Sequence, residues 1–300
     1  MGTLIDGKAM AGQIQAEVAL GVQALCAEGH RPPGLAAVLV GEDPASQVYV
    51  RNKHKACQGA GLRSEIFRLP ADCPREQLLG LVDLLNADPS WDGILVQLPL
   101  PAHLDEQEVI ERIQPHKDVD GFHPVNAGRV LAGLPGAFSP ATPAGVQEML
   151  KRSGISVAGA HVVIVGRSNI VGKPMASLLV QKGEGADATV TVCHSRTRNL
   201  PEICRQADIL VAAIGRARFI TADMVKEGAV VVDVGINRVE DPSAPKGSRL
   251  VGDVDFEGVA PRCSAITPVP GGVGPMTIAM LLRNTLDSAR RRSRPLGGRV

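Results

Sequence analysis

Apolar positions in the first half of the chain fall in short runs that alternate with segments of helical period. The runs predict buried strands at residues 35–40, 64–69 and 93–98. Helices are expected to begin near residues that suit a helix start, namely Gly7, Pro44, Pro74 and Asp105. Because strands that alternate with helices pair in parallel beneath those helices, this half predicts an α/β domain.

A second series of apolar runs repeats the pattern. It predicts strands at residues 161–165, 189–193, 209–213 and 230–234. We expect these strands to form a Rossmann-like, doubly wound parallel sheet. The crossing between the two domains is expected within residues 128–143, which are rich in glycine and proline.

A final helix is expected over residues 276–292, because Pro275 suits its start, and it is expected to return to the first domain. The predicted fold class is therefore α/β, with two α/β domains flanking a cleft. The predicted bounds are residues 1–140 plus 274–300 for the first domain and 141–273 for the second.

Composition excludes several classes of protein. The chain has 300 residues, 44% hydrophobic and 21% charged, with a formal net charge of +1. This balance gives no reason to expect nucleic acid or an anionic membrane as partner, and 2% aromatic residues argue against base stacking. The arginine-rich segment 290–294 is expected to be a solvated tail.

The six cysteines are scattered and form no C-x-x-C pair, so neither a disulfide framework nor a zinc site is expected. No apolar run approaches the roughly 18 residues that span a bilayer. Asp6 and Lys8 stand where a signal peptide would be apolar. We therefore expect a cytoplasmic protein.

The single tyrosine, Tyr49, precedes Lys53 by four residues on the predicted helix that begins at Pro44. A phenol and an amine at this spacing share one helix face, which suits proton transfer. The simpler alternative is a packed tyrosine without a catalytic role.

A glycine-containing turn, residues 166–174, follows the strand 161–165 and leads into an apolar helix. Glycine allows close approach of a ligand to the backbone, and the helix start directs free N–H groups at an anion. Ser168 and Val171 occupy the second and third glycine positions of the common dinucleotide fingerprint, so the turn alone is a weak signal.

His116, Asp118, Asp120 and His123 are residue types that bind metals, but their spacing does not place two ligands on one helix face. No metal is expected.

Four separated motifs, in order, resemble the bifunctional methylenetetrahydrofolate dehydrogenase/cyclohydrolase family over nearly the whole chain. They are Tyr49-Val50-Arg51-Asn52-Lys53-His54-Lys55-Ala56, Gly93-Ile94-Leu95-Val96-Gln97-Leu98-Pro99-Leu100-Pro101, Lys117-Asp118-Val119-Asp120-Gly121-Phe122 and Thr267-Pro268-Val269-Pro270-Gly271-Gly272-Val273-Gly274-Pro275. The turn Gly166-Arg167-Ser168 is also similar to that of the family, serine included. Only the tail after about Asp287 lies outside the resemblance.

The resemblance implies oxidation of 5,10-methylenetetrahydrofolate by NADP, followed by hydrolysis of the methenyl cation to 10-formyltetrahydrofolate. It places the catalytic residues at Lys53, Tyr49, Gln97 and Asp120. The same four are expected to bind substrate, together with Leu98, Pro270, Gly271 and Gly274. Cofactor contacts are expected from Gly166, Arg167, Ser168, Ser195, Arg196, Ile236 and Thr277. A homodimer is expected by resemblance alone.

Physical arguments support three of these roles. Gln97 ends a predicted parallel strand, at the edge where such sheets bind ligands. Asp120 could pair with the N–H donors of a pterin, although it and Asp118 could equally be turn residues with side chains in water. Lys53 can act as a base near neutral pH only if burial or nearby positive charge lowers its pKa from about 10.4. The methenyl cation would supply such a charge.

Preference for NADP over NAD is expected from the turn after the strand 189–193, which carries no carboxylate for a ribose hydroxyl. Ser195, Arg196 and Arg167 could instead bind a 2′-phosphate. The alternative is an exposed basic turn.

Three other functions share features with this chain. A short-chain dehydrogenase also uses a Tyr-x-x-x-Lys pair, but there the pair follows the dinucleotide turn, whereas here it precedes Gly166 by more than a hundred residues. A shikimate-type dehydrogenase has the same domain order, and the motifs around Gln97 and Asp120 favour folate over it. A catalytically silent folate- or NADP-binding module remains the alternative from a different class.

Overall fold

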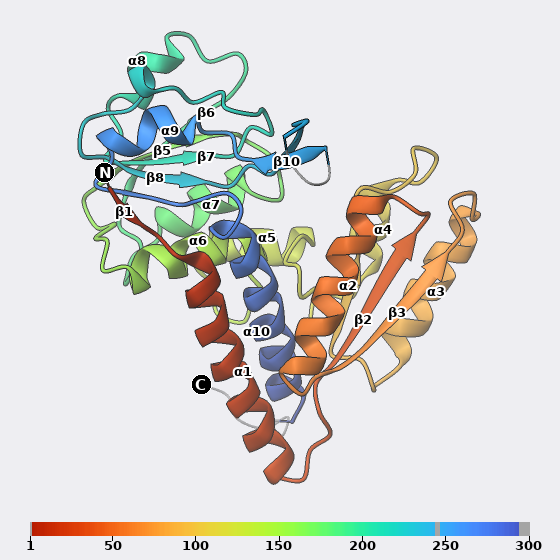
Figure 1. Ribbon diagram of the computed structural model, residues 1–300. Coiled ribbons are helices and arrows are strands. Elements are labelled where there is room, and N and C mark those ends of the chain that lie inside the picture. Colours follow the sequence, from red (N-terminus) through yellow and green to blue (C-terminus); the bar gives the residue numbers. More distant parts are fainter. Residues whose placement is uncertain (1, 244–246, 294–300) are drawn as a thin grey trace. The chain divides into compact units, whose positions relative to one another are not determined.

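The computed structural model describes residues 2–243 and 247–293 of the chain, which divides into two compact units (Figure 1). Unit 1 comprises the described residues up to Ala11 together with Thr142–Thr277. Unit 2 comprises Gly12–Ala141 and the described residues from Ile278 onward. Among the described residues, no helix is both long and apolar enough to cross a membrane.

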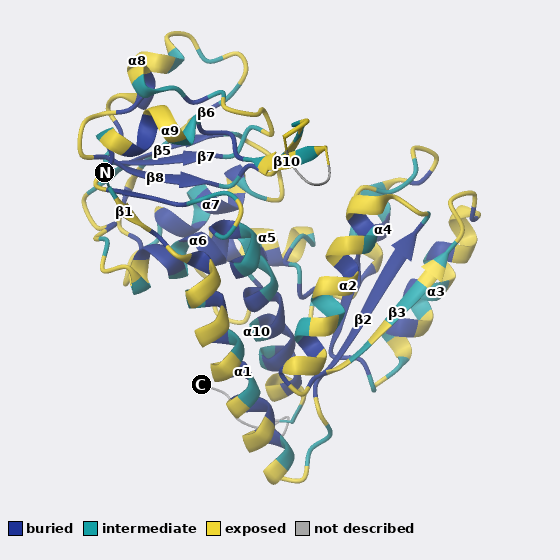
Figure 2. Ribbon diagram, in the orientation of Figure 1, coloured by how far each residue is buried: buried dark blue, intermediate teal, exposed yellow. Residues whose placement is uncertain are grey.

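Unit 2 contains a three-stranded parallel sheet in the order β3-β2-β4. The strands are β2 (Gly34–Val40), β3 (Arg63–Leu69) and β4 (Gly93–Val96), and the helices are α2 (Pro44–Gly59), α3 (Arg75–Ala87), α4 (Glu106–Arg112) and α5 (Pro124–Leu131). Every residue of β2 and β4 is buried, so the sheet is the core of this unit (Figure 2). The helix predicted at Pro44 is confirmed, and Asp43 caps it by accepting a hydrogen bond from Ser46 N at 2.7 Å.

Unit 1 contains a six-stranded sheet in the order β1-β11-β8-β7-β5-β6, with all of its strands parallel. These strands are β1 (Thr3–Leu4), β5 (His161–Val165), β6 (Thr189–Cys193), β7 (Ile209–Ala212), β8 (Val230–Asp233) and β11 (Ala265–Ile266). The chain leaves β5 in one direction to β6 and then crosses back to β7, so the strand order reverses beside β5. Open α/β sheets bind their ligands at such a switch point. The predicted α/β class and Rossmann-like sheet are confirmed.

The remaining elements of unit 1 surround this sheet. They are the helices α6 (Ala141–Arg152), α7 (Gly172–Leu179), α8 (Leu200–Cys204) and α9 (Phe256–Val259), the short turns η1 (Ala222–Met224) and η2 (Ala260–Arg262), and the antiparallel hairpin of β9 (Asn237–Glu240) and β10 (Ser248–Val251). Two longer helices, α1 (Gly7–Ala27) and α10 (Val273–Ser293), begin in unit 1 and continue into unit 2.

The structure corrects two expectations about irregular segments. Residues 128–131 belong to helix α5, and α6 begins at Ala141, so the irregular connection is limited to residues 132–140. A glycine in the last turn of α5 is tolerated because the Gly128 carbonyl still accepts a hydrogen bond from Ala132 N at 3.0 Å.

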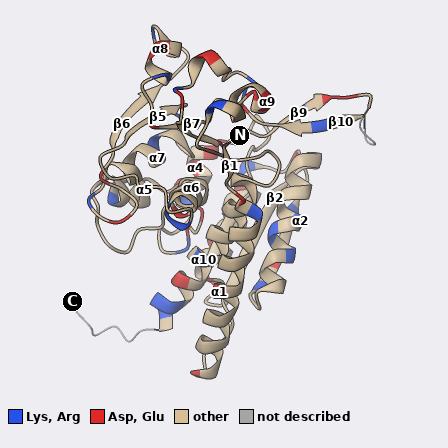
Figure 3. Cartoon of the chain, turned by 60° about the vertical axis from the view of Figure 1, so that its left-hand side comes forward, with Lys and Arg blue, Asp and Glu red and all other residues tan. Residues whose placement is uncertain are grey.

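The arginine-rich segment at the end of α10 was expected to be a solvated tail, and this expectation is wrong. Arg292 Nε donates to the buried Asp92 carboxylate at 2.8 Å, which Arg31 also contacts at 2.6 Å. The guanidinium of Arg291 lies 4.3 Å from the centre of the Phe138 ring. Figure 3 shows these basic residues at the end of α10, and position 294 lies outside the described residues. The end of α10 is therefore bound to unit 2 through the buried Asp92 carboxylate and the Phe138 ring.

Candidate active site

Tyr49 and Lys53 lie four residues apart on helix α2, as the sequence predicted. Tyr49 is 39% exposed, whereas Lys53 is partly buried. The Lys53 amine donates a hydrogen bond to Oε1 of Gln97 at 3.1 Å. The helix and the end of strand β4 therefore meet at this amine.

Gln97 follows directly after β4, where its backbone N–H donates to Val38 O at 2.9 Å. Its side-chain Nε2 donates to the carbonyl of Leu98 at 2.7 Å. With the NH₂ group engaged there, the carbonyl oxygen of the amide is the group that faces Lys53. Gln97 can thus orient the amine of Lys53.

Asp120 reaches the same edge of the sheet through a short bridge to β4. Ile94 pairs with Asp118, and Ile94 N donates to the carbonyl of Lys117 at 2.8 Å, so residues 117–120 run alongside β4, the strand that Gln97 follows. Burial raises the pKa of the Asp120 carboxyl to about 6; the Lys53 ammonium opposes this rise and the Asp118 charge adds to it. Asp120 and Lys53 therefore interact electrostatically at one site.

Burial also acts on Lys53, in the opposite sense. It lowers the pKa of the amine below the ordinary 10.5, while the negative charge of Asp120 raises it. A lysine with a lowered pKa has more of its neutral form near neutral pH, which is the form that can accept a proton. The geometry and the charge balance at Lys53 both suit a general base.

Asp118, two residues from Asp120, has a structural role. Its buried carboxylate accepts hydrogen bonds from Phe122 N at 3.2 Å, His123 N at 2.8 Å and Asn126 Nδ2 at 2.8 Å. The alternative that its side chain lies in water is wrong. This structural role could not be predicted from the sequence, because its three partners come from the turn and helix that follow it. In the described part of the chain, no three His, Cys, Asp or Glu side chains are grouped so as to hold a metal ion.

In unit 1, other backbone segments lie so close to two glycines of the turn after β5 that neither glycine has room for a side chain. Gly166 has φ +139°, and a Cβ placed on it would lie 2.1 Å from the carbonyl oxygen of Ala213. A Cβ on Gly172 would lie 2.1 Å from the carbonyl oxygen of Gly166. Ser168 Oγ accepts a hydrogen bond from Val171 N at 3.1 Å, and no side chain caps the start of α7. The turn and helix start can therefore receive a phosphate group.

The residues expected at the 2′-phosphate follow two neighbouring strands. Val165 of β5 pairs with Cys193 of β6, so Arg167 and the turn with Ser195 and Arg196 project from the same edge of the sheet. All three are exposed. Their placement suits recognition of an anion at the edge of the sheet.

The other predicted residues of unit 1 lie around the start of α10. A Cβ on Gly274 would lie 3.4 Å from Cδ1 of Ile236, a side chain that is 43% exposed. Thr277 Oγ1 lies 2.9 Å from Thr142 Oγ1. Pro270 is exposed and Gly271 has φ +105°. The predicted site residues therefore fall in both units. Those in unit 2 are Tyr49, Lys53, Gln97, Leu98 and Asp120, and all the other predicted site residues belong to unit 1.

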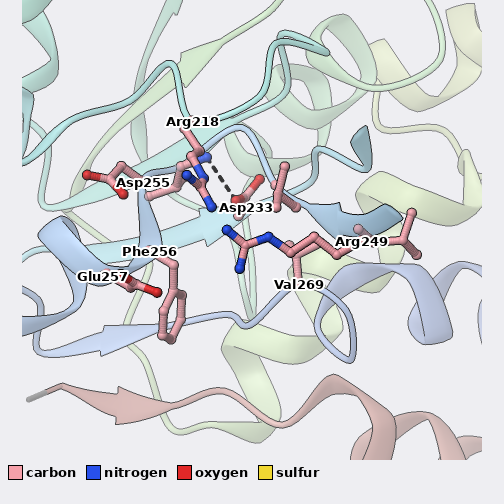
Figure 4. A pocket seen from close by; sticks show the side chains of 11 residues that line it. Arg218, Asp233, Arg249, Asp255, Phe256, Glu257 and Val269 are labelled. Atoms are coloured by element: carbon pink, nitrogen blue, oxygen red, sulfur yellow. Dashed lines mark hydrogen bonds between the residues drawn. The ribbon is translucent and has the colours of Figure 1, made fainter. Parts of the chain in front are cut away.

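A pocket of about 170 Å³ also lies in unit 1, near the carboxyl ends of β8 and β11 (Figure 4). Arg218 and Arg249 extend into the same space beside Asp233, with Phe256 also on its lining. None of the predicted site residues lines it.

Two models of the same protein family match the chain, one in each half. The model described as "Tetrahydrofolate dehydrogenase/cyclohydrolase, catalytic domain" matches residues 5–120. The model described as "Tetrahydrofolate dehydrogenase/cyclohydrolase, NAD(P)-binding domain" matches residues 140–293. The chain belongs to the tetrahydrofolate dehydrogenase/cyclohydrolase family. The family predicted from the four sequence motifs is confirmed.

Relatives of this family match the chain along almost its full length. The bifunctional protein FolD of Prosthecochloris aestuarii is 59% identical over 289 residues, which cover 96% of this chain and 98% of the relative. The crystal structure of the bifunctional FolD enzyme of Campylobacter jejuni is 49% identical, with a TM-score of 0.91, and the match covers 97% of this chain and 100% of that chain. These matches confirm the predicted enzyme class.

The Trypanosoma brucei enzyme of this family, solved with NADP cofactor and an inhibitor, is 42% identical with a TM-score of 0.92; the match covers 98% of this chain and 99% of that chain. The NADP cofactor predicted for this chain is confirmed. A shikimate 5-dehydrogenase from Thermus thermophilus is only 18% identical with a TM-score of 0.51, covers 86% of this chain and 98% of that chain, and shares the fold alone.

Proposed function

We propose that Lys53, Tyr49, Gln97 and Asp120 form the catalytic site of this family member. The enzyme oxidises 5,10-methylenetetrahydrofolate to 5,10-methenyltetrahydrofolate with NADP and then hydrolyses the product to 10-formyltetrahydrofolate. The observation that supports the site assignment best is the hydrogen bond from the Lys53 amine to Gln97 Oε1, at the same sheet edge as Asp120. Unit 2 then carries the catalytic residues, and unit 1 binds NADP.

In the hydrolytic step, water adds to the methenyl carbon and loses a proton. The neutral Lys53 amine accepts that proton, because burial and the adjacent substrate cation both favour its uncharged form. As the carbon–nitrogen bond of the five-membered ring breaks, the Lys53 ammonium returns the proton to the leaving nitrogen. The oxygen of the added water becomes the formyl carbonyl and releases its remaining proton to solvent. Gln97 Oε1 holds the amine in place throughout.

Asp120 and Tyr49 complete the site in unit 2. With a pKa of about 6, Asp120 is mostly ionised at neutral pH and can accept hydrogen bonds from the N–H donors of the pterin. Tyr49 shares the helix face of Lys53, where its hydroxyl can take part in proton transfer. Leu98, Pro270, Gly271 and Gly274 supply further substrate contacts.

In the oxidative step NADP, when bound, accepts a hydride from the one-carbon unit of the substrate. The turn Gly166-Arg167-Ser168 and the uncapped start of α7 hold its pyrophosphate. Arg167, Ser195 and Arg196 bind the 2′-phosphate, because their loops follow adjacent strands. The backbone of Ile236 would contact the nicotinamide half of the bound cofactor, and Thr277 would lie near the cofactor.

We further infer that the enzyme is a homodimer in the cytoplasm. All six cysteines are free, and five of them are buried, which fits a reducing compartment. Sedimentation of the purified chain tests the subunit count. A mass of one chain would contradict the dimer.

A spectrophotometric assay tests the function directly. Mixing the protein with NADP and methylenetetrahydrofolate is expected to produce NADPH, and methenyltetrahydrofolate is expected to disappear without added cofactor. A chain that binds both ligands but turns over neither would instead be a silent binding module.

A further inference from the structure

Asp253 lies in the turn between strand β10 and helix α9 of unit 1, and it is fully buried. Its Oδ2 accepts hydrogen bonds from the backbone N–H groups of Ile214 at 2.6 Å and Gly215 at 2.8 Å. Its Oδ1 accepts a hydrogen bond from the side-chain amide of Asn237 at 2.9 Å. One carboxylate thus ties the loop that follows β7 to the residues that follow β8.

A second buried carboxylate, that of Asp233 at the end of β8, fixes the backbone around Asp253. It accepts hydrogen bonds from the N–H groups of Asp253 at 2.9 Å, Val254 at 2.9 Å and Gly235 at 3.0 Å. Asp233 N in turn donates to Thr267 Oγ1 at 2.7 Å, at the start of the motif 267–275. Figure 4 shows Asp233 beside the pocket of unit 1. The two carboxylates together connect three loops.

Two glycines make room for these carboxylates. A Cβ on Gly235 would lie 2.2 Å from Oδ1 of Asp253, and a Cβ on Gly252 would lie 1.8 Å from Oδ2 of Asp233. Distances this short are incompatible with any side chain, so both positions accept only glycine unless the carboxylates move. Gly235 directly precedes Ile236, the residue assigned to the nicotinamide half.

We propose that Asp253 is a positioning residue for NADP: its carboxylate fixes the loops after β7 and β8 and thereby the backbone of Ile236. The inference rests on the proposed function, which assigns Ile236 to the cofactor. These loops follow the carboxyl ends of neighbouring parallel strands, where open α/β sheets bind nucleotides. Because Asp253 is 0% exposed, it acts through the loops and not by touching the cofactor.

Only a carboxylate satisfies all three donors around Asp253. It has two acceptor oxygens and no donor, and both oxygens face N–H groups. An asparagine has the same shape, but its NH₂ group would face either the side-chain amide of Asn237 or the two backbone N–H groups. Asp253→Asn therefore disturbs the loops with little change in side-chain volume.

The test measures cofactor binding and hydrolysis separately in the full-length enzyme. For Asp253→Asn, the calorimetric Kd and the KM for NADP are expected to rise about tenfold, the scale of one hydrogen bond to a charged group. The hydrolysis of methenyltetrahydrofolate without NADP is expected to stay within about twofold, since its catalytic residues lie in unit 2.

A second variant and a control complete the test of the proposal. Asn237→Ala removes one of the three hydrogen bonds and is expected to raise the Kd for NADP about threefold, even if Asp253→Asn does not fold. Asp208→Asn is the matched control, because Asp208 accepts a hydrogen bond from His161 N at the amino ends of the strands. Its Kd for NADP is expected to equal that of the wild type.

An unchanged Kd for NADP in both Asp253→Asn and Asn237→Ala would overturn the proposal. Equal loss of both activities in Asp253→Asn would also overturn it, because that pattern marks a residue needed only for folding. A wild-type chain that does not bind NADP would instead contradict the proposed function itself.

Discussion

The Lys53 amine and the Asp120 carboxylate each oppose the effect that burial has on the pKa of the other. Burial lowers the pKa of Lys53 and Asp120 raises it; burial raises the pKa of Asp120 to about 6 and Lys53 lowers it. Each charge thus keeps the other from being neutralised completely. A change in the charge of Asp120 should therefore alter the titration of Lys53.

The balance predicts how Asp120→Asn changes the pH dependence of hydrolysis. Removing the carboxylate removes the charge that raises the pKa of Lys53, so the neutral amine should form at lower pH. The rise of kcat with pH is expected to move to lower pH, while the KM for folate increases. The rate is measured against uncatalysed hydrolysis at each pH. A rise that stays at the same pH would contradict the coupling.

Asp120→Asn also tests stability. The folded pKa of Asp120 is raised from 3.8 to about 6, so its stabilising contribution is fully present below pH 3.8 and is lost as the pH rises through about 6. Asparagine resembles the protonated form and carries no such loss. The variant is expected to be more stable than the wild type by about 3 kcal/mol above pH 7 and equally stable below about pH 3, as measured by urea unfolding.

Gln97 offers a test of positioning at Lys53. Gln97→Ala removes the acceptor of the 3.1 Å hydrogen bond and is expected to lower the kcat of hydrolysis about a hundredfold, the scale of misplaced acid–base catalysis. Gln97→Glu keeps an acceptor but adds a negative charge, which raises the pKa of Lys53. Its activity should recover as the pH is raised, whereas that of Gln97→Ala should not.

Cofactor preference depends on the loops after β5 and β6. Arg167→Ala combined with Arg196→Ala is expected to raise the KM for NADP by roughly tenfold to a hundredfold, the scale of charge-assisted hydrogen bonds, and to leave the KM for NAD unchanged. Lys226→Ala is the control, since Lys226 pairs with Asp208 near the amino ends of the strands. A parallel increase for both cofactors would show that the arginines do not read the 2′-phosphate.

The contacts of Asp92 predict that Arg292, near the end of α10, contributes to the stability of the fold. The Asp92 side chain is 1% exposed and contacts both Arg31 and Arg292. Either arginine alone can neutralise it, but replacing both with alanine leaves a buried, unpaired charge. The double variant is expected to lose about 3–5 kcal/mol of stability in urea unfolding, more than the sum of the single losses. Additive single losses would contradict this pairing.

The sequence predicted strands and their helices well where apolar runs were long, as at β2 and β5. It overestimated β4, which ends at Val96: Gln97 N still donates to Val38 O, but Pro99 has no N–H with which to continue the pairing. The hairpin of β9 and β10 was not predicted. Its strands are short and mostly polar, so no apolar period marks them.

The predicted site residues could be found because they lie in motifs of fixed order. Their supporting groups could not, because a sequence does not show which distant backbone N–H groups converge on one carboxylate. Asp118 holds the turn and helix that follow Asp120, and Asp253 holds loops from two other strands. Neither supporting role could be predicted before the hydrogen-bond partners of Asp118 and Asp253 were known.

The catalytic assignment of Lys53 is tested most directly by Lys53→Met, which keeps an unbranched side chain but removes the amine. Methenyltetrahydrofolate hydrolysis and NADP reduction are measured on the same preparation, with circular dichroism as the check on folding. We expect hydrolysis to fall to the uncatalysed rate while much of the dehydrogenase activity remains, since hydride transfer needs no base. Retained hydrolysis, or an equal loss of both activities in a folded variant, would contradict the account.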